Sequence, residues 1–195
     1  SEYLDSVGAA AGQLGRLVDN LVDLSRLDLD AVQPPPEPVD VISVTAEAIS
    51  ALRPIADERG ARIELSAPGQ LPHVRGRTEA AFQIVINLLD NALKYTPTGT
   101  AVDVELTATH EDEVQITIRD RGPGLPAEGR EQLFELFTRG PESPHVNSKG
   151  FGIGLHIVKA WTDSLGGTVS ADNHPEGGAR FVCRLPVWHS EEPRA

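Results

Sequence analysis

The chain has 195 residues, a formal net charge of -12 at pH 7 and a single cysteine, Cys183. Proteins that neutralise nucleic-acid phosphates need clustered Lys and Arg, so the acidic balance excludes nucleic acid as the principal partner. A single cysteine cannot form an internal disulfide, and no apolar run reaches the roughly eighteen residues that cross a bilayer. We therefore expect a cytoplasmic chain, or the cytoplasmic portion of a membrane-bound protein.

The opening stretch carries an apolar seam that steps by three and four positions: Leu4, Val7, Ala11, Leu14, Val18 and Leu21. This spacing predicts a long bundle-forming helix over residues 1–30. A single helix cannot bury such a seam, so we expect it to pair with a preceding helix, with another subunit, or with both. Packing against its own domain is the alternative. The proline-rich stretch 31–38 predicts a stiff linker, because proline lacks a backbone donor.

Residues 39–188 alternate between helical and strand patterns, as expected of one mixed domain. The apolar spacing predicts helices over 41–59, 78–95, 131–137 and 153–165, and strands over 62–66, 102–107, 114–119, 169–171 and 181–187. The late strands are joined by turns of hairpin length, which favours a mixed, largely antiparallel sheet. The predicted fold class is therefore α+β, a two-layer α/β sandwich with helices on one face of the sheet. Residues 189–195 are predicted to be a frayed tail.

The predicted helix 78–95 carries a polar line beside its apolar stripe. Asn87, Asn91 and Lys94 are spaced by four and three residues, so two amides and an ammonium share one side of the helix. An amide oxygen suits Mg²⁺, which prefers hard oxygen ligands, and a lysine supplies positive charge for phosphate. An ordinary solvated helix face is the alternative interpretation, and this helix alone does not exclude it.

Asp120 follows a predicted strand in the parity of Ile116 and Ile118. Its carboxylate is therefore expected to point toward the apolar side, where a lone charge is costly and usually has a partner or a ligand. Gly122 and Gly124 follow directly, and they permit a tight backbone path that a flat ligand can approach.

A second glycine-rich segment, Gly150, Gly152 and Gly154, leads into the predicted helix 153–165. Backbone amides at a helix start lie at the positive end of the helix dipole, which suits a triphosphate. Residues 138–150 have few apolar side chains and include the cation Arg139, as in a mobile lid. The chain lacks both a Gly-x-x-x-x-Gly-Lys-Ser/Thr loop and a protein-kinase catalytic loop, so a different ATP-binding fold remains.

Four segments resemble, in the same order and at similar separations, the N, first glycine, F and second glycine boxes of the ATP-binding domain of sensor histidine kinases. This domain belongs to the superfamily shared with gyrase, Hsp90 and MutL. The segments are 87–96, 120–124, 134–139 and 150–155. Four boxes in order are a specific signal, where any one would be weak. The resemblance covers residues 39–187, and the opening helix resembles the second helix of the family's dimerisation and phosphoacceptor hairpin.

This resemblance implies an ATP and Mg²⁺ site with a role for each matched residue. Asn87 would coordinate Mg²⁺, and Asp120 would accept a hydrogen bond from the adenine amino group. Arg139 would reach the terminal phosphate from the edge of the lid, so that the implied catalytic set is Asn87, Lys94 and Arg139. The implied nucleotide contacts are Asn91, Lys94, Tyr95, Asp120, Gly122, Gly124, Gly150, Gly152, Gly154 and Leu155.

The resemblance also implies a reaction, the transfer of the ATP γ-phosphoryl group to a histidine and then to an aspartate of a response regulator. Hydrolysing members of the superfamily resemble each other in having Glu where this chain has Asn87, and an amide cannot take a proton from water. We therefore expect slow ATP turnover. The expected partners are a response regulator, an upstream phosphoacceptor helix, and a second copy of the protein bound through the N-terminal helix.

The acceptor histidine of that family is missing from this chain. None of the six histidines has the acidic neighbour, nearby proline and apolar helix of that acceptor: His73, His110, His145, His156, His174 and His189. We expect that the sequence starts just after the acceptor helix, rather than that a kinase has lost its acceptor. Two alternatives remain open, a catalytically silent nucleotide-binding regulatory module and a serine or threonine protein kinase of the same superfamily. The opening helix and its linker favour the histidine kinase over the second of these.

Overall fold

The computed structural model describes residues 35–110, 112–127, 130–136 and 152–189. The expected opening helix, the first half of the expected linker and the expected lid lie outside these residues, as do Arg139 and Gly150. Within the described ranges, no helix is both long enough and apolar enough to cross a membrane.

A five-stranded sheet forms the centre of the described part of the chain, in the order β2, β4, β5, β7, β6. Its strands are β2 (Arg62–Ser66), β4 (Ala101–Ala108), β5 (Glu113–Arg119), β6 (Thr168–Asn173) and β7 (Ala179–Pro186). In this sheet β2 and β4 pair in parallel, whereas every other neighbouring pair is antiparallel. The predicted strands and the predicted mixed, largely antiparallel pairing are therefore confirmed.

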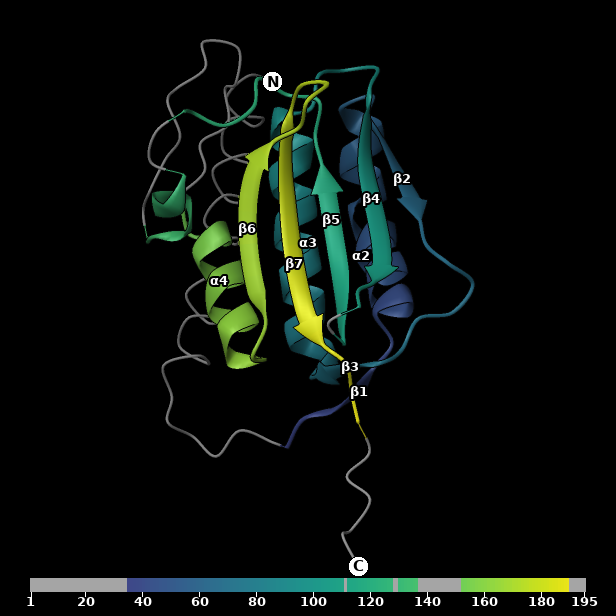
Figure 1. Cartoon of the computed structure of the whole chain (residues 1–195). Helices are drawn as coiled ribbons and strands as arrows, with labels where there is room; N and C mark the ends of the chain where they lie inside the picture. Colours follow the sequence, from purple (N-terminus) through teal and green to yellow (C-terminus); the bar gives the residue numbers. More distant parts are fainter. Residues whose placement is uncertain (1–34, 111, 128–129, 137–151, 190–195) are drawn as a thin grey trace, which may run out of the picture. The chain divides into compact units, whose positions relative to one another are not determined.

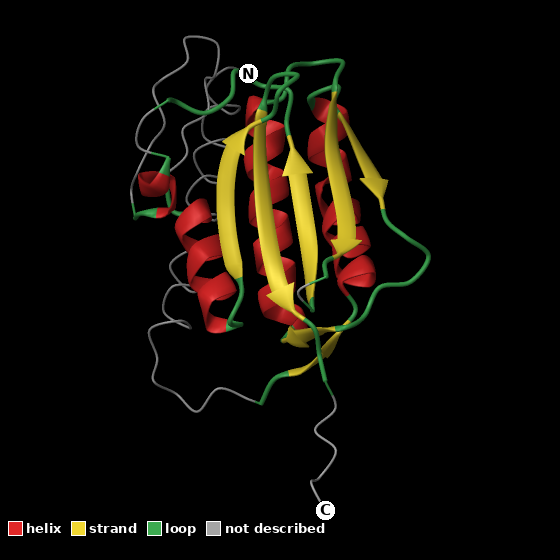
Figure 2. Cartoon of the chain, in the orientation of Figure 1, coloured by secondary structure: helices red, strands yellow, loops and turns green. Residues whose placement is uncertain are grey.

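Three helices lie against one face of this sheet (Figure 1): α2 (Val41–Glu58), α3 (Thr78–Tyr95) and α4 (Gly154–Ser164). Figure 2 shows the same arrangement as a layer of helices behind a layer of strands. Apolar and polar side chains alternate along β4, and this alternation gives the sheet one apolar face. Val102 and Val104 are buried, while Asp103 and Glu105 point to the other side. Burial of the apolar face against the helices stabilises the sandwich, and the predicted fold class is confirmed.

The helix α3 packs against both α2 and α4. Its buried side chains include Ile84, Val85, Leu88 and Leu89, each 0% exposed. Such a stripe fixes the rotation of the helix about its axis, because turning it would expose apolar surface. The polar line of this helix is thereby held in one direction.

A short two-stranded ribbon pairs β1 (Glu37–Val39) with β3 (Val74–Gly76). The sequence predicts neither strand and places Glu37 in the linker, because three residues are too few to show a strand alternation. Glu37 Oε1 accepts hydrogen bonds from Thr78 N at 3.3 Å and from Thr78 Oγ1 at 2.9 Å. Arg77, the N-cap residue of α3, provides no capping side chain. The ribbon therefore supplies the missing cap at the start of α3.

The helix expected over 131–137 is shorter in the structure, where only the 3₁₀ helix η1 (Glu131–Phe134) forms. A 3₁₀ turn rarely extends beyond three or four residues, because its hydrogen-bond geometry is poor. His156 Nδ1 on α4 lies 3.1 Å from the carbonyl oxygen of Phe134, so a hydrogen bond joins η1 to α4.

Cys183 on β7 is 0% exposed and lies 3.5 Å from the Thr162 hydroxyl. Burial raises the pKa of its thiol to about 12. The thiol therefore stays protonated and unreactive, as expected of a core cysteine.

Candidate functional site

Asp120 lies directly after β5 and is 1% exposed. Its Oδ1 accepts hydrogen bonds from Gly122 N at 2.8 Å and from Ala179 N at 3.0 Å. Its own backbone N donates to Ala179 O at 2.9 Å, which fixes the residue at the junction of β5 and β7. Oδ1 accepts both of the hydrogen bonds that described residues donate to this carboxylate. Oδ2 is therefore left as an acceptor. The predicted inward direction of Asp120 is confirmed.

Burial raises the pKa of Asp120 above its ordinary value of 3.8, because removal from water disfavours the charged form. The backbone hydrogen bonds from Ala179 and Gly122 and the charge of Arg119 oppose this rise. A carboxylate that is buried at such a cost, with one oxygen that accepts no hydrogen bond from the described residues, is typical of a ligand site.

Gly122 brings the loop after β5 against the end of α3. A Cβ atom at Gly122 would lie only 2.6 Å from the carbonyl oxygen of Tyr95 and 3.0 Å from Tyr95 Cβ. A side chain therefore does not fit between the two segments, and glycine permits the close approach. The structure thus brings together the predicted site residues Tyr95, Asp120 and Gly122.

Asn173, at the end of β6, holds the same loop from the other side. Its Oδ1 accepts a hydrogen bond from Leu125 N at 2.6 Å, and its Nδ2 donates to Leu125 O at 3.0 Å. A Cβ atom at Gly124, where φ is +81°, would lie 2.7 Å from Asn173 Oδ1. Asn173 is not predictable from the sequence, because a single amide at a strand end belongs to no recognisable pattern.

Gly178 covers the backbone of Asp120 in the hairpin between β6 and β7. Its φ is +84°, and a Cβ atom there would lie 1.9 Å from Asp120 O. The sequence predicts a turn of hairpin length between these two strands but not this contact. Only the pairing of β7 with β5 brings the hairpin to Asp120.

Asn87, on the half-buried side of α3, faces the start of α4. Its Nδ2 donates to Gln83 O at 2.8 Å and approaches Gln83 Oε1 at 3.3 Å. The other amide atom, Oδ1, is then turned to Gly154, where a Cβ atom would lie 3.1 Å from it. Two predicted site residues from separate segments, Asn87 and Gly154, are therefore neighbours.

The Asn87 amide oxygen is a hard donor of the kind that Mg²⁺ prefers. The described residues contain no group of three or more His, Cys, Asp or Glu side chains that could hold a metal ion. A metal bound here would therefore depend on Asn87 and on oxygen atoms of a bound ligand and water, which fits Mg²⁺ because it retains several waters.

Asn91 and Lys94 continue the line along α3, and both are half-buried. Lys94 Nζ lies 3.3 Å from Asp90 Oδ2, in an ion pair between partly exposed side chains. Such pairs contribute little, so the ammonium can turn to a phosphate at small cost.

The start of α4 lacks a side-chain cap. Gly152 has a φ of +70°, and Ile153, the N-cap residue, makes no capping hydrogen bond. Isoleucine cannot accept a hydrogen bond from the first-turn amides, which include those of Gly154 and Leu155. These donors can therefore bind an anion at the positive end of the helix dipole.

The placed residues form two groups along α3. We call Tyr95, Asp120, Gly122 and Gly124 the Asp120 end, and Asn87, Gly152, Gly154 and Leu155 the Asn87 end. Asn87 and Tyr95 are about 12 Å apart along the helix axis, since the rise is about 1.5 Å per residue. An extended nucleoside triphosphate can bridge that span. Arg139 and Gly150, predicted for the same site, lie outside the described residues.

Comparison with known proteins gives consistent matches. The family described as "Histidine kinase-, DNA gyrase B-, and HSP90-like ATPase" matches residues 76–189. The adaptive-response sensory kinase SasA of Synechococcus sp. (strain CC9311) is 34% identical over 156 residues, which are 80% of this chain and 40% of that protein. The sensor-like histidine kinase SenX3 of Mycobacterium bovis (strain ATCC BAA-935 / AF2122/97) is 31% identical over 194 residues, covering 97% of this chain and 47% of that protein.

Among solved structures, full-length ShkA in complex with AMPPNP has a TM-score of 0.78 and 26% identity, covering 97% of this chain and 39% of that chain. The chain thus spans less than half the length of each of these three relatives. The family match includes all the described residues of both ends of the site. The chain therefore belongs to the histidine kinase-, DNA gyrase B- and HSP90-like ATPases, and within them to the ATP-binding catalytic domains of sensor histidine kinases.

Proposed function

We propose that this chain binds ATP with Mg²⁺ and transfers the γ-phosphoryl group to a histidine outside the chain, from which it passes to an aspartate of a response regulator. Phosphoryl transfer requires mainly positioning and charge neutralisation. The Asp120 end supplies positioning, and the Asn87 end supplies polar and positive groups for the phosphates. The similar protein ShkA, whose structure was solved in complex with AMPPNP, supports a nucleotide as the ligand.

The buried carboxylate of Asp120 is the observation that carries this proposal. Backbone donors occupy Oδ1, which leaves Oδ2 to accept a hydrogen bond from the exocyclic amino group of adenine. A guanine base has a carbonyl oxygen at that ring position, and two acceptors would then face each other. This geometry therefore favours ATP over GTP.

The phosphates would lie at the Asn87 end. In this proposal Asn87 Oδ1 holds Mg²⁺, and Asn91 and Lys94 contact the phosphate oxygens together with the amides of Gly152, Gly154 and Leu155. When bound, Mg²⁺ neutralises charge on the phosphate oxygens. The sequence adds Gly150 to the phosphate loop and Arg139 as a cation for the terminal phosphate.

The remaining assignments follow from the resemblance and from the relatives. Residues 1–30 are proposed to form the second helix of a dimerisation hairpin, 31–38 the linker and 39–188 the catalytic domain, in a cytoplasmic protein. The partners are an upstream phosphoacceptor helix, a second copy and a response regulator. The sensory kinases SasA and SenX3 favour this assignment over a serine or threonine kinase and over a silent module.

A phosphotransfer assay distinguishes these functions. The chain is incubated with ATP, Mg²⁺ and a polypeptide that carries the upstream helix, and the phosphorylated product is then treated with acid. We expect an acid-labile phosphohistidine. An acid-stable phosphoserine would instead identify the serine or threonine kinase, and nucleotide binding without transfer would identify the silent module.

Asp120→Asn tests the adenine contact. An asparagine can keep its Oδ1 on the backbone donors of Gly122 and Ala179, but it presents a donor where the adenine amino group needs an acceptor. We expect ATP affinity to fall by roughly 100-fold, about 3 kcal/mol, while the circular dichroism spectrum stays unchanged. Retained ATP affinity would contradict the assignment of Asp120 to adenine.

Asn87→Asp tests the metal contact separately. We expect the Mg²⁺ concentration that supports nucleotide binding to shift, while the affinity for nucleotide in EDTA changes little, because Asn87 lies at the phosphate end. Isothermal titration with and without Mg²⁺ measures both quantities. An unchanged Mg²⁺ dependence would remove Asn87 from the metal site.

A further inference from the structure

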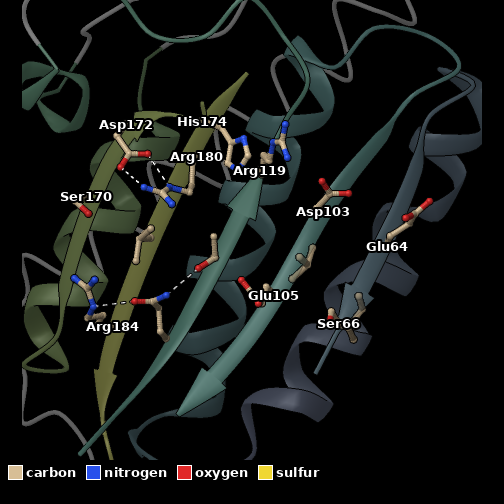
Figure 3. A pocket seen from close by; sticks show the side chains of 15 residues that line it. Glu64, Ser66, Asp103, Glu105, Arg119, Ser170, Asp172, His174, Arg180 and Arg184 are labelled. Atoms are coloured by element: carbon tan, nitrogen blue, oxygen red, sulfur yellow. Dashed lines mark hydrogen bonds and ion pairs between the residues drawn. The ribbon is translucent and has the colours of Figure 1, made fainter. Parts of the chain in front are cut away.

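The face of the sheet that carries no helices has a hollow of about 590 Å³ (Figure 3). Side chains from β2, β4, β5, β6 and β7 line it. Neither Asp120 nor Asn87 is among them, so this hollow is separate from the nucleotide site.

Over β5 and β7, the pairing of the strands places one pair of short side chains between two pairs of long ones. The short pair forms the floor of the hollow, and the long pairs form its two walls. Thr117 lies opposite Val182, and these shorter side chains are 9% and 8% exposed. Arg119 lies opposite Arg180 on one side of this pair, and Gln115 lies opposite Arg184 on the other side. We call these six residues the arginine groove: Gln115, Thr117, Arg119, Arg180, Val182 and Arg184.

The charges of the groove are incompletely neutralised. Arg180 forms a two-pronged ion pair with Asp172, at 2.8 Å and 2.6 Å. Arg119 pairs with Glu176 at 3.1 Å, but the Glu176 side chain is 76% exposed and this pair is weak. Among the described residues, the Arg184 side chain donates only to the neutral Gln115, at 3.0 Å, and no carboxylate of theirs lies within ion-pair distance of it.

The cross-strand pairing of two of these arginines opposes stability. Arg119 and Arg180 are direct cross-strand neighbours, and like charges in that position destabilise a sheet. The whole chain carries a net charge of -12, so a general excess of basic residues does not explain the cluster. Of the acidic residues that line the hollow, Asp172 pairs with Arg180, whereas Glu64, Asp103 and Glu105 lie on β2 and β4, away from Arg180 and Arg184 (Figure 3). An anionic ligand over β5 and β7 would relieve the repulsion.

We propose that the arginine groove docks an extended acidic segment of a partner protein. Guanidinium groups pair with carboxylates through two parallel hydrogen bonds, and the low floor of Thr117 and Val182 leaves room for an extended backbone. Arg180 and Arg184 are about 13 Å apart along β7, the separation of carboxylates four residues apart in an extended chain. A small anion cannot span that distance. A second copy of this chain is a poorer occupant, because a symmetric pairing through this groove would place its arginines against the same arginines of the other copy.

Fluorescence anisotropy of labelled hexaglutamate with the 195-residue chain tests this proposal. We expect the wild type to bind hexaglutamate but not hexalysine, with an affinity that falls as salt increases. Arg184→Glu should weaken binding by about ten-fold, and Arg184→Lys should keep part of it. The matched control is Arg53→Glu, an exposed position on α2 with the same change of charge. It should alter binding by less than about two-fold, because α2 lies on the opposite face.

ATP affinity should be the same in the wild type, Arg184→Glu and Arg53→Glu, which verifies that each variant is folded. The proposal is overturned if hexaglutamate does not bind, if Arg184→Glu retains full affinity, or if Arg53→Glu loses as much. If inorganic phosphate displaces hexaglutamate when both supply the same concentration of negative charge, the groove would be assigned to a small anion instead. Sedimentation that shows a dimer lost in Arg184→Glu would assign it to a second copy.

Discussion

The two ends of the nucleotide site are held in different ways. At the Asp120 end, the protein itself supplies the contacts: the backbone of Ala179 and Gly122 binds Asp120, and Asn173 binds Leu125. At the Asn87 end, the start of α4 has no side-chain cap, and Lys94, on α3 between Asn87 and Tyr95, has only a partly exposed ion pair. The first end is therefore formed without a ligand, whereas the second has donors and charge that a ligand would complete.

This difference agrees with the chemistry of the two parts of ATP. A flat, neutral base is recognised by the position of a few acceptors and donors, so a preformed pocket lowers the ordering cost of binding. Phosphates bring charge, and charge can be matched by backbone amides, a metal and mobile cations. Damage at the Asp120 end should therefore reduce stability and binding together, whereas damage at the Asn87 end should reduce binding alone.

Gly178→Ala should produce the largest effect, because it breaks the Asp120 end directly. The new Cβ would lie 1.9 Å from Asp120 O at a φ of +84°, so the hairpin or Asp120 must move. We expect a loss of about 3 kcal/mol or more in the free energy of unfolding, together with loss of ATP binding. Urea denaturation and nucleotide titration measure these quantities.

Gly177→Ala is the matched control for that prediction. Gly177 also has a positive φ, +97°, but a Cβ there would meet no atom within 4 Å. Only backbone strain should then be felt, about 1 kcal/mol, and ATP binding should persist. Equal stabilities for the two variants would show that the contact with Asp120 does not hold the pocket.

Sequence patterns predict the fold well where they extend over many residues. The alternation in β4 and β5 and the apolar stripe of α3 each identify a whole element, because burial on one face sets the period. The ribbon of β1 and β3 is missed since each of its strands has only three residues. The helix predicted around the short η1 is too long for a related reason, because the apolar residues of this segment also fit a longer helix.

The site is predicted where a single segment contains its own signal. Asp120 is identified by its parity in the strand, and Asn87, Asn91 and Lys94 by their helical spacing. Asn173 and Gly178 are not identified, because their contacts with Leu125 and Asp120 arise only when β6 and β7 join the sheet. Local patterns report the direction of a side chain, and long-range pairing decides which residues it meets.

Asn173→Ala sharpens the comparison with a smaller change at the same end. It removes both hydrogen bonds to Leu125 without creating a clash. We expect the free energy of unfolding to fall by about 1 kcal/mol and ATP affinity to fall by about ten-fold, because the glycine loop loses its anchor. Ser170→Ala on the same strand is the control, and it should change neither quantity. An unchanged ATP affinity in Asn173→Ala would show that the loop is held by Asp120 alone.

The smallest effect should be a dependence of stability on pH at Asp120. The pKa of this carboxyl is raised by burial, so between 3.8 and the raised value the folded state keeps a proton that the unfolded chain has released. Stability from this residue therefore falls as the pH rises through that window and is constant above it. Asp120→Asn cannot titrate, so its stability relative to the wild type should increase across the window.

Asp172→Asn provides the control of opposite sign, on the face of the sheet away from the nucleotide site. The hydrogen bonds from Arg180 hold the pKa of Asp172 below 3.8, so its contribution is present above that pH and is lost as the pH falls through the lowered value. Urea denaturation of both variants and the wild type between about pH 2.5 and 7 measures the two curves. If Asp120→Asn follows the wild type at every pH, the carboxylate is not held at an energetic cost. The Asp120 end would then be no more preformed than the Asn87 end.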